Sequence, residues 1–456
     1  MKNGDSRHSY IERNGKMNTK YLIIGNSAGG IGAAEAIRNV DKSSSVTIVS
    51  DEPYPCYSRP LISKYLTGER DLEDILFRPT EFYKNNTINP LLGKHVTSLS
   101  PSEHMAELDS GEYITWEKLL IASGGAPIIP KLDGLEKRGV FNFITLDDAK
   151  AIDSFLGGVS TAVVIGGGLI GVSASEALIM KGVNVTIVEM KERILNTILD
   201  EQASLMSEEA LKRADVRVIT GCTVTEVTGK EYVTAVTISN GEKIPCSLVV
   251  VAIGVMPRTE LVQGTDIEVN RGIVVDRSMT TNHPDVYACG DAVEAYDFVY
   301  GDYRLTPIWP NAYLGGRIAG YNMAGIETTY PGSTSMNSLN YFGLDIAAAG
   351  ITAPPEENGY EVLSRQKDGI YQKVVLKDDL IVGMVFVQDI EKSGIVFGLM
   401  RDKINVCDFK QSILTDEFGF VSLPRELWQE RLGIPPSGSV LPPDLSEETV
   451  EDFAGE

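Results

Sequence analysis

The sequence has 456 residues, including 41 Lys or Arg and 63 Asp or Glu, which gives a formal net charge of −22. At about 100–200 residues per domain, this length predicts several domains and a substantial hydrophobic core. The negative charge repels nucleic-acid phosphates and anionic lipid headgroups, so we expect neither a nucleic acid nor a membrane as a partner.

The cysteines are dispersed and form no Cys-x-x-Cys pair, which argues against a zinc knuckle or an adjacent redox dithiol. They stand at Cys56, Cys222, Cys246, Cys289 and Cys407. No apolar run reaches the about 18–20 residues of a membrane span, and the first 20 residues lack the apolar segment of a signal peptide. We therefore expect a cytoplasmic protein with residues 1–18 as a disordered leader, and either Met1 or Met17 as its first residue. With only four His, no metal site is expected.

A strand, a glycine loop and a helix follow one another near the amino terminus. Residues 21–25 are an apolar run that stops at glycine, and residues 32–37 have the small-residue pattern of a helix. Residues 46–49 are β-branched and predict a second strand. This order is typical of a βαβ unit.

The loop of this unit has Gly25, Ser27 and Gly30 in the spacing of a dinucleotide fingerprint, with Ser at the middle glycine position. Serine is small enough to let a phosphate approach and can donate its hydroxyl to it. Asp51 or Glu52, after the second strand, would then hold a ribose. For this copy alone, an ordinary connection in a parallel sheet is the alternative.

The same pattern returns 141 residues later, counted from Gly25 to Gly166 (166 − 25). Gly166, Gly168 and Gly171 form the complete fingerprint, preceded by an apolar strand and followed by a helical pattern. These glycines allow a tight turn, close approach of a pyrophosphate and close helix packing. An internal duplication of a nucleotide-binding unit is the simplest interpretation.

An acidic residue ends the second strand of this second unit. Glu189 lies 23 residues after Gly166, where a carboxylate would bind ribose hydroxyls and repel a 2′-phosphate. The pattern therefore predicts NADH rather than NADPH. The basic residues Lys191 and Arg193 follow closely and weaken this preference.

The rest of the chain supplies linkers and a different sheet. Residues 116–121 and 248–253 are strands that open into glycine and proline turns. After Pro331 the pattern changes to alternating strands, for example at residues 371–376 and 380–387 on either side of an Asp378-Asp379 turn. The expected fold class is therefore α/β, with two Rossmann-like dinucleotide-binding domains and a C-terminal α+β closing domain.

Five ordered motifs resemble a known family. They are Ile24-Gly-Asn-Ser27, Leu120-Ile-Ala-Ser-Gly124, Gly166-Gly-Gly-Leu-Ile-Gly171, Ala252-Ile-Gly-Val-Met-Pro257 and Val286-Tyr-Ala-Cys-Gly-Asp291. The set resembles the two-dinucleotide-domain flavoproteins, which include disulfide reductases, NADH oxidases, ferredoxin and rubredoxin reductases, and the flavin part of NADH-dependent nitrite reductases. The resemblance covers about residues 20–432.

The resemblance implies that the first domain binds FAD and that an inserted second domain binds NADH. The expected boundaries are residues 19–128 and 259–330 for the FAD domain, 129–258 for the NADH domain, 331–434 for the closing domain and 435–456 for an acidic tail. Asp291 would hydrogen-bond the ribityl chain of FAD, and its alternative role is to cap the following helix.

The resemblance also implies further contacts with the cofactors. The turn at Ala122, Ser123 and Gly124 resembles the Ala-Thr-Gly turn of the family, with Ser in place of Thr, and would pass close to FAD. Trp309 begins a predicted helix whose N-terminus would face the flavin and favour its reduced form, with plain core packing as the alternative for Trp309. The remaining residues expected at the cofactors are Val96 and Gly254.

Residues 51–66 distinguish among the subfamilies. They carry no thiol where disulfide reductases place a Cys pair and oxidases a single Cys, and Cys56 is expected to be a buried spare thiol. Arg59 and Lys64 instead resemble the Arg-Pro-x-x-Ser-Lys segment of ferredoxin and rubredoxin reductases. Lys64 would act catalytically by stabilising negative charge on the reduced flavin, and its alternatives are helix capping or phosphate binding. Arg59 would contact the flavin or form an ion pair.

Two positions depart from the family pattern. A family Glu that lies near the nicotinamide is Ser173 here, and an aromatic gate is Leu169. Residues 360–432 resemble the closing domain of rubredoxin and nitrite reductase flavoproteins. No His follows His283, so the catalytic His of disulfide reductases is missing.

The resemblance implies an FAD-dependent NADH:electron-carrier oxidoreductase. Hydride would pass from NADH to the flavin, and single electrons would then pass to a small rubredoxin- or ferredoxin-type iron–sulfur protein. The alternatives are an oxidase that uses O2, a flavin subunit that feeds a nitrite reductase, and a sensing protein that keeps FAD structurally. A monomer or a homodimer is expected.

Overall fold

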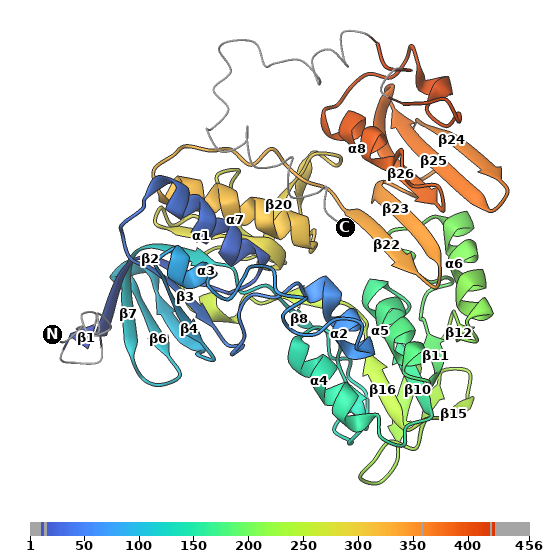
Figure 1. The fold of residues 1–456 in the computed structure, drawn as a ribbon, viewed down its shortest axis with the longest axis horizontal. Coiled ribbons are helices and arrows are strands. Elements are labelled where there is room, and N and C mark those ends of the chain that lie inside the picture. Colours follow the sequence, from blue (N-terminus) through green and yellow to red (C-terminus); the bar gives the residue numbers. More distant parts are fainter. Residues whose placement is uncertain (1–10, 13–15, 357–358, 420–421, 425–456) are drawn as a thin grey trace.

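The computed structural model describes residues 11–12, 16–356, 359–419 and 422–424. Three sheets of five or more strands form the framework of the described residues, and Figure 1 shows them side by side with their helices. We call the sheet of β2 and its helices the first unit, the sheet of β10 and its helices the second unit, and the last five strands the closing sheet. The fold is α/β, as the sequence predicts, because two of the three sheets alternate parallel strands with helices.

The first unit contains a sheet of order β4-β3-β2-β7-β6-β5, to which β1 and β19 also pair. Its strands are β1 (Ile11–Glu12), β2 (Lys16–Ile24), β3 (Val46–Ser50), β4 (Ile88–Leu92), β5 (Val96–Ser100), β6 (Met105–Leu108), β7 (Tyr113–Ile121) and β19 (Val286–Ala288). Strands β4, β3, β2, β7 and β19 run parallel, so their carboxyl ends meet at one edge, whereas β6 and β5 continue the sheet antiparallel. Ligands of such sheets bind at this edge.

The expected leader ends earlier than predicted. Strand β2 begins at Lys16, and its residues from Lys16 to Thr19 pair with Tyr113–Trp116 of β7. Met17 packs against the core of the first unit. The prediction of a disordered leader through residue 18 is therefore wrong for residues 11–12 and 16–18, which pair with each other as β1 and β2, because a polar sequence can form a strand when a neighbour pairs with it. The expected acidic tail at 435–456 lies outside the described residues.

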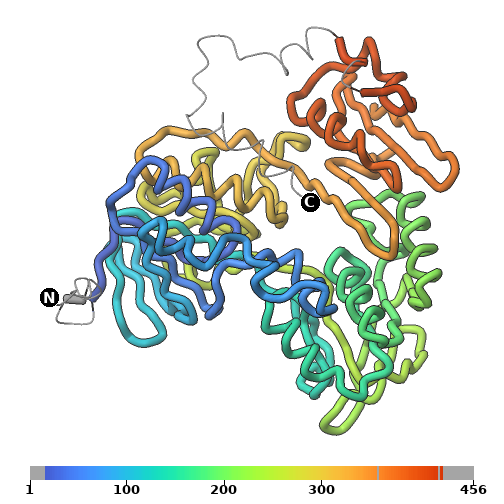
Figure 2. The backbone as a smooth tube through the Cα atoms, in the orientation of Figure 1, coloured from blue at the N-terminus to red at the C-terminus, as the bar shows by residue number. Residues whose placement is uncertain are grey.

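Helices α1 (Ala28–Val40) and α7 (Trp309–Met323) cross at very close range, although they are far apart in the sequence. A Cβ atom on Gly316 would lie 2.0 Å from the carbonyl oxygen of Gly29, and one on Gly320 would lie 2.4 Å from that of Ala33. Figure 2 shows the two segments side by side. Only glycine permits this backbone contact, which brings the start of α7 beside the first loop.

Short elements complete the first unit. They are α2 (Ile62–Thr67), α3 (Phe82–Asn85), β18 (Ile273–Val274), the 3-10 turn η4 (Gly290–Ala292), β20 (Val293–Asp297) and β21 (Asp302–Arg304). Helix α2 packs on helices of the second unit, as Figure 1 shows. It therefore lies at the junction of the two units.

The second unit is a parallel sheet of order β12-β11-β10-β16-β9. Its elements are β9 (Val140–Phe141), α4 (Leu146–Phe155), β10 (Thr161–Ile165), α5 (Leu169–Met180), β11 (Asn184–Val188), α6 (Glu201–Arg213), β12 (Arg217–Ile219) and β16 (Leu248–Val251), with the antiparallel ribbon β13 (Val224–Thr228), β14 (Ala235–Ile238) and β15 (Lys243–Pro245). The strand, loop and helix predicted around Gly166 are β10 and α5. Strands β8 (Gly125–Pro127) and β17 (Val255–Pro257) pair where the chain crosses between the two units.

The closing sheet is antiparallel, with order β22-β23-β26-β25-β24, and helix α8 (Ser393–Arg401) covers one face. Its strands are β22 (Met336–Tyr341), β23 (Leu344–Gly350), β24 (Tyr360–Lys367), β25 (Ile370–Lys377) and β26 (Leu380–Val387). The predicted turn at Asp378-Asp379 joins β25 to β26. Both residues have positive φ, 52° and 56°, as the favoured two-residue hairpin turn requires.

The closing sheet is joined to the second unit by a shared hydrophobic core and by buried polar contacts. Lys373 pairs with Asp200 at 2.8 Å, with side chains only 10% and 9% exposed, and the Tyr371 hydroxyl donates to the same carboxylate at 2.6 Å. Asp200 also caps α6. Buried charges of this kind are costly unless paired, so the cluster favours one register of the closing sheet on the second unit.

Candidate dinucleotide-binding sites

The first loop leaves β2 through a turn that only glycine permits. Gly25 has φ +119°, and a Cβ atom there would lie 2.1 Å from the carbonyl oxygen of Ala122. A Cβ on Gly30 would lie 1.9 Å from the carbonyl oxygen of Gly25. The first glycine thus makes the tight turn and the last packs α1 against the strand, as the fingerprint requires.

The second loop repeats this geometry. Gly166 has φ +108°, and its Cβ would lie 2.4 Å from the carbonyl oxygen of Ala252. A Cβ on Gly171 would lie 1.9 Å from the carbonyl oxygen of Gly166. The structural match between the loops supports the predicted duplication.

The middle fingerprint position is Ser27 in the first loop and Gly168 in the second. Both are the extended residues immediately before α1 and α5, and neither caps its helix through a side chain. A Cβ on Gly168 would meet no atom within 4 Å, so this position of the second loop has room for a small side chain such as the serine of the first. The N–H groups at the start of a helix suit a phosphate, so both loops fit the pyrophosphate of a dinucleotide.

Glu189 is held firmly at the end of β11. Its Oε2 accepts a hydrogen bond from the backbone N of Gly167 at 2.7 Å, and its Oε1 accepts one from the backbone N of Lys191 at 2.7 Å. The side chain is 9% exposed. The acid therefore touches the second loop directly, in the place where a ribose carboxylate is expected.

The first unit has no acidic residue at the position that corresponds to Glu189. Gly25 N donates to Val49 O and Gly166 N donates to Val188 O, each at 2.8 Å, so the residue equivalent to Glu189 is Ser50. The two expected ribose acids follow one and two residues later. The sequence alone did not show this offset.

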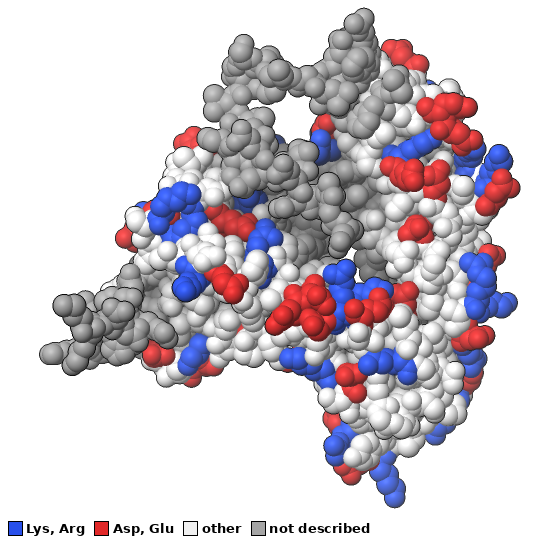
Figure 3. Space-filling view, in the orientation of Figure 1, with Lys and Arg blue, Asp and Glu red and all other residues white. Residues whose placement is uncertain are grey.

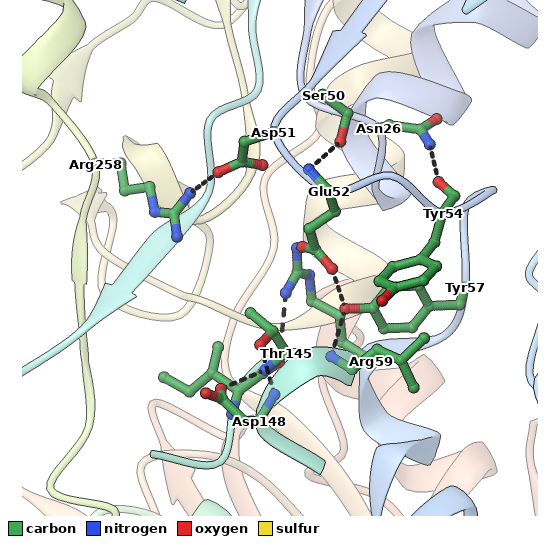
Figure 4. Close-up of polar contacts among 12 residues, drawn as sticks. Asn26, Ser50, Asp51, Glu52, Tyr54, Tyr57, Arg59, Thr145, Asp148 and Arg258 are labelled. Carbon is green, nitrogen blue, oxygen red and sulfur yellow. Dashed lines mark hydrogen bonds and ion pairs between the residues drawn. The ribbon is translucent and has the colours of Figure 1, made fainter. Parts of the chain in front are cut away.

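Asp51 and Glu52 instead have partners within the protein. Asp51 forms an ion pair with Arg258 at 3.1 Å. Glu52 forms an ion pair with Arg59 and accepts a hydrogen bond from the Tyr57 hydroxyl at 2.5 Å. Figure 4 shows both groups. Arg59 thus forms the ion pair that was one of its two expected roles. The ribose contacts of Asp51 and Glu52 stay predictions.

The turn from Ala122 to Gly124 lies between β7 and β8, and it forms hydrogen bonds with Arg258, the residue that follows β17. The Ser123 hydroxyl donates to the carbonyl oxygen of Arg258 at 2.8 Å, and the backbone N of Arg258 donates to Gly124 O at 2.9 Å. On the second crossover, Gly254 has φ +113°, a conformation that favours glycine. Serine and the threonine of the family motif both carry a hydroxyl, and in Ser123 this hydroxyl links the turn to the residue after β17.

Asp291 lies in η4 and is followed by strand β20, so it does not cap a helix and that alternative is excluded. Burial raises its pKa to about 6, and the positive charge of Arg59 opposes the rise. Asp291 is partly buried. A carboxylate that is partly removed from water is costly without partners, so this group suits a hydroxyl-bearing ligand such as the ribityl chain.

Three further predicted residues have defined surroundings. The ring of Trp309 packs edge-on against Phe77, with centroids 5.2 Å apart, which supports its packing role. Val96 is 5% exposed and its side chain lies in the core of the first unit. Lys64 is partly exposed and pairs with Glu69 at 3.1 Å. No contact with a flavin follows from these positions, so those roles stay predictions.

The thiols fit the expected absence of disulfide chemistry. All five cysteines are free. Cys56 is buried, and burial raises the pKa of its thiol to about 12, as it does for Cys246 and Cys289. These groups are protonated near neutral pH and so are poor nucleophiles.

Neither a metal cluster nor a membrane span is found where the structure describes the chain. None of its helices is long and apolar enough to cross a membrane. No group of three or more His, Cys, Asp or Glu side chains there is placed to hold a metal ion.

Comparison with known proteins assigns the family. The model of the pyridine nucleotide-disulphide oxidoreductases matches residues 19–316, and that of the rubredoxin NAD+ reductase C-terminal domain matches residues 336–404. The chain belongs to the pyridine nucleotide-disulphide oxidoreductase family. Members of this family are oxidoreductases that bind FAD and NADH, and the two loops fit these dinucleotides.

Three curated relatives illustrate the range of this family. The NADH-dependent phenylglyoxylate dehydrogenase subunit epsilon of Aromatoleum evansii is 32% identical and covers 87% of this chain and 95% of the relative. The NADH-rubredoxin oxidoreductase of Clostridium acetobutylicum is 28% identical over 82% of this chain and 92% of the relative. The nitrite reductase [NAD(P)H] of Bacillus subtilis is 29% identical over 85% of this chain, which spans only 48% of that protein.

Two solved structures from this family share the architecture. The NAD-dependent persulfide reductase from A. fulgidus has a TM-score of 0.80 with 25% identity, and the match covers 86% of this chain and 78% of that one. A ferredoxin reductase from Rhodopseudomonas palustris has a TM-score of 0.78 with 25% identity and covers 85% of this chain and 95% of that one. The same fold thus accompanies different acceptors.

Proposed function

We propose that this chain is an FAD-dependent NADH:electron-carrier oxidoreductase that passes electrons to a small iron–sulfur or rubredoxin-type protein. The observation that carries the proposal is the presence of two loops with the same phosphate-binding geometry in one chain. The relatives named as rubredoxin and ferredoxin reductases support this class of acceptor.

The residues of the first unit would hold FAD. Gly25, Ser27 and Gly30 would receive its pyrophosphate, and Asp291 would bind its ribityl chain. The turn Ala122–Gly124 lies against the same loop, since Ala122 contacts Gly25. When bound, FAD supplies the ability to accept a hydride and to release electrons singly.

The residues of the second unit would hold NADH. Gly166, Gly168 and Gly171 would receive its pyrophosphate, and Glu189 its adenosine ribose. The negative charge of Glu189 would repel a 2′-phosphate, so NADH is preferred over NADPH. Lys64 lies on α2, between the two units, where its positive charge would favour the reduced cofactor.

A flavin subunit that feeds a nitrite reductase is the second candidate. It is favoured by the match to about half of the Bacillus subtilis enzyme. The two candidates share the NADH reaction and differ in the acceptor.

The purified protein, saturated with FAD, should lose its oxidised-flavin absorbance within seconds of mixing with NADH. The reduced protein is then mixed separately with rubredoxin, a ferredoxin, a nitrite reductase component and O2. Fastest reoxidation by rubredoxin or ferredoxin is the expected result. Failure of NADH to bleach the flavin would refute the proposal, and fastest reoxidation by O2 would assign an oxidase instead.

A further inference from the structure

The segment from Glu52 to Arg59 links the first unit to helix α4 of the second (Figure 4). Tyr57 lies at its centre and is only 5% exposed. Its hydroxyl donates to Glu52 Oε2 at 2.5 Å and accepts a hydrogen bond from the backbone N of Leu146 at 2.9 Å. One hydroxyl therefore has partners in both units.

The partner in the second unit is the start of a helix. Leu146 is the first residue of α4, so its N–H has no partner within the helix. Thr145 and Asp148 form a capping box that fixes this helix start, with Asp148 N donating to the Thr145 hydroxyl at 3.1 Å. The Tyr57 hydroxyl adds a restraint that comes from the other unit.

Arg59 forms a second link in the same place. It pairs with Glu52 and donates to the carbonyl oxygen of Ile144 at 3.3 Å. Burial alone would lower the pKa of Arg59, but Tyr57 and Glu52 raise it above its ordinary value. The guanidinium stays charged, so the Glu52 carboxylate that accepts from Tyr57 is itself held in position.

A third link starts in the first loop. Asn26 Nδ2 donates to the carbonyl oxygen of Tyr54 at 3.2 Å, and the Tyr54 hydroxyl donates to Asp147 Oδ1 of α4 at 2.6 Å. The loop that would hold FAD is thus connected through Asn26, Tyr54 and Asp147 to α4, the helix whose Leu146 N donates to the Tyr57 hydroxyl.

We infer that Tyr57 is a positioning residue for hydride transfer, because its hydroxyl fixes the second unit relative to the first. This inference rests on the proposed function. Hydride transfer needs its reacting atoms about 3–3.5 Å apart, and the two loops that would hold the cofactors belong to different units. A small shift between the units therefore changes that distance without changing either binding loop.

The test compares Tyr57→Phe with the matched variant Tyr21→Phe. Tyr21 is also buried, and its hydroxyl also donates to a carboxylate, Asp41 Oδ2 at 3.1 Å. Both residues lie in the first unit, and Asp41 follows the C-terminal end of α1, whereas the first loop precedes this helix. Each variant thus loses a buried hydroxyl that donates to a carboxylate, but only Tyr57→Phe removes a contact between units.

In Tyr57→Phe, the limiting rate of flavin reduction at saturating NADH should fall about tenfold, while the Kd for NADH stays unchanged. Independently of cofactors, backbone amide exchange in residues 144–150 should become faster. Tyr21→Phe, saturated with FAD, should show neither change. Should Tyr57→Phe not fold, Glu52→Gln weakens the acceptor of the same hydroxyl and should accelerate the same exchange.

Unchanged amide exchange in Tyr57→Phe, or equal losses of rate in both tyrosine variants, would overturn the inference. If NADH does not reduce the flavin of the unmodified protein, the proposed function fails. In that case the exchange measurement still decides whether Tyr57 couples the two units.

Discussion

The Glu189 carboxylate has a structural role in the second loop, and it would also supply the selectivity proposed above. Backbone N–H groups of Gly167 and Lys191 hold its two oxygens at 2.7 Å. Each oxygen keeps a lone pair that a ribose hydroxyl can use. The acid is therefore preorganised, and its charge faces any nucleotide in the second loop.

Glu189→Ala should shift the ratio of kcat/KM for NADH over NADPH by at least about tenfold toward NADPH, which corresponds to about 1.4 kcal/mol. The ratio is the quantity to measure, since loss of the two hydrogen bonds lowers both values together. Glu192→Ala, three residues further on, removes an equal charge and should leave the ratio unchanged. An unchanged ratio in Glu189→Ala would remove this residue from the ribose site.

The raised pKa of Asp291 predicts that the free energy of unfolding of the FAD-free protein depends on pH. Burial raises its pKa from 3.8 to about 6. Between these two pH values the folded chain retains a proton that the unfolded chain has lost. Stability therefore falls as the pH rises through this window, and the full penalty is present above pH 6.

The FAD-free Asp291→Asn variant should be more stable than the original protein at pH 7. The shift of 2.2 (6 − 3.8) corresponds to about 3 kcal/mol. At pH 3 the advantage should vanish, because the carboxyl is then mostly protonated in both states. Urea unfolding at a series of pH values measures this, and an advantage that does not vary with pH would contradict the assignment of the shifted group.

At the scale of elements, the crossing of α1 and α7 depends on glycine. Gly316→Ala should destabilise the fold by about 1–3 kcal/mol and weaken FAD retention, because its Cβ would meet Gly29 O at 2.0 Å. Gly394→Ala in α8 is the matched control. Its Cβ meets nothing within 4 Å, so stability should be unchanged or slightly higher. Equal urea midpoints for the two variants would show that the helices can separate without cost.

The elements of the two units were largely predictable because their signals are local. A glycine turn between an apolar strand and a small-residue helix has few other structures available, so the loops at Gly25 and Gly166 follow from the sequence. The hairpin at Asp378-Asp379 is similar, since its turn needs residues that tolerate positive φ.

The contacts between elements were not predictable in this way. The roles of Tyr57 and Asn26 depend on α4, which lies some 90 and 120 residues further along the chain. The offset that makes Ser50 the equivalent of Glu189 appears only in the hydrogen-bond register. The strand at Lys16 forms because β7 pairs with it, and no local pattern marks it.

At the scale of the molecule, the net charge of −22 repels negatively charged partners. Figure 3 shows basic and acidic side chains interspersed on the face it draws, with no large basic area among the described residues there. An acidic electron carrier would therefore meet net repulsion at low salt. Salt reduces this repulsion, since the Debye length falls from about 30 Å at 0.01 M to about 3 Å at 1 M.

The rate of electron transfer to an acidic carrier should accordingly rise with ionic strength. A neutral quinone as acceptor is the control, and its rate should stay nearly constant. A carrier rate that falls as salt is added would reveal a basic docking area on another face.

The first unit is completed by elements that come late in the sequence. Its strand β19 pairs with β7, although 164 residues lie between Ile121 and Val286, and α7 follows still later, whereas the strands of the second unit all lie between Val140 and Val251. At about 5–20 residues per second, a ribosome needs on the order of 10–30 s to deliver β19 after β7. During that time the second unit can fold, while the exposed edge of the first sheet needs protection by chaperones. The order of the elements along the chain thus makes the middle of this protein the first part able to fold.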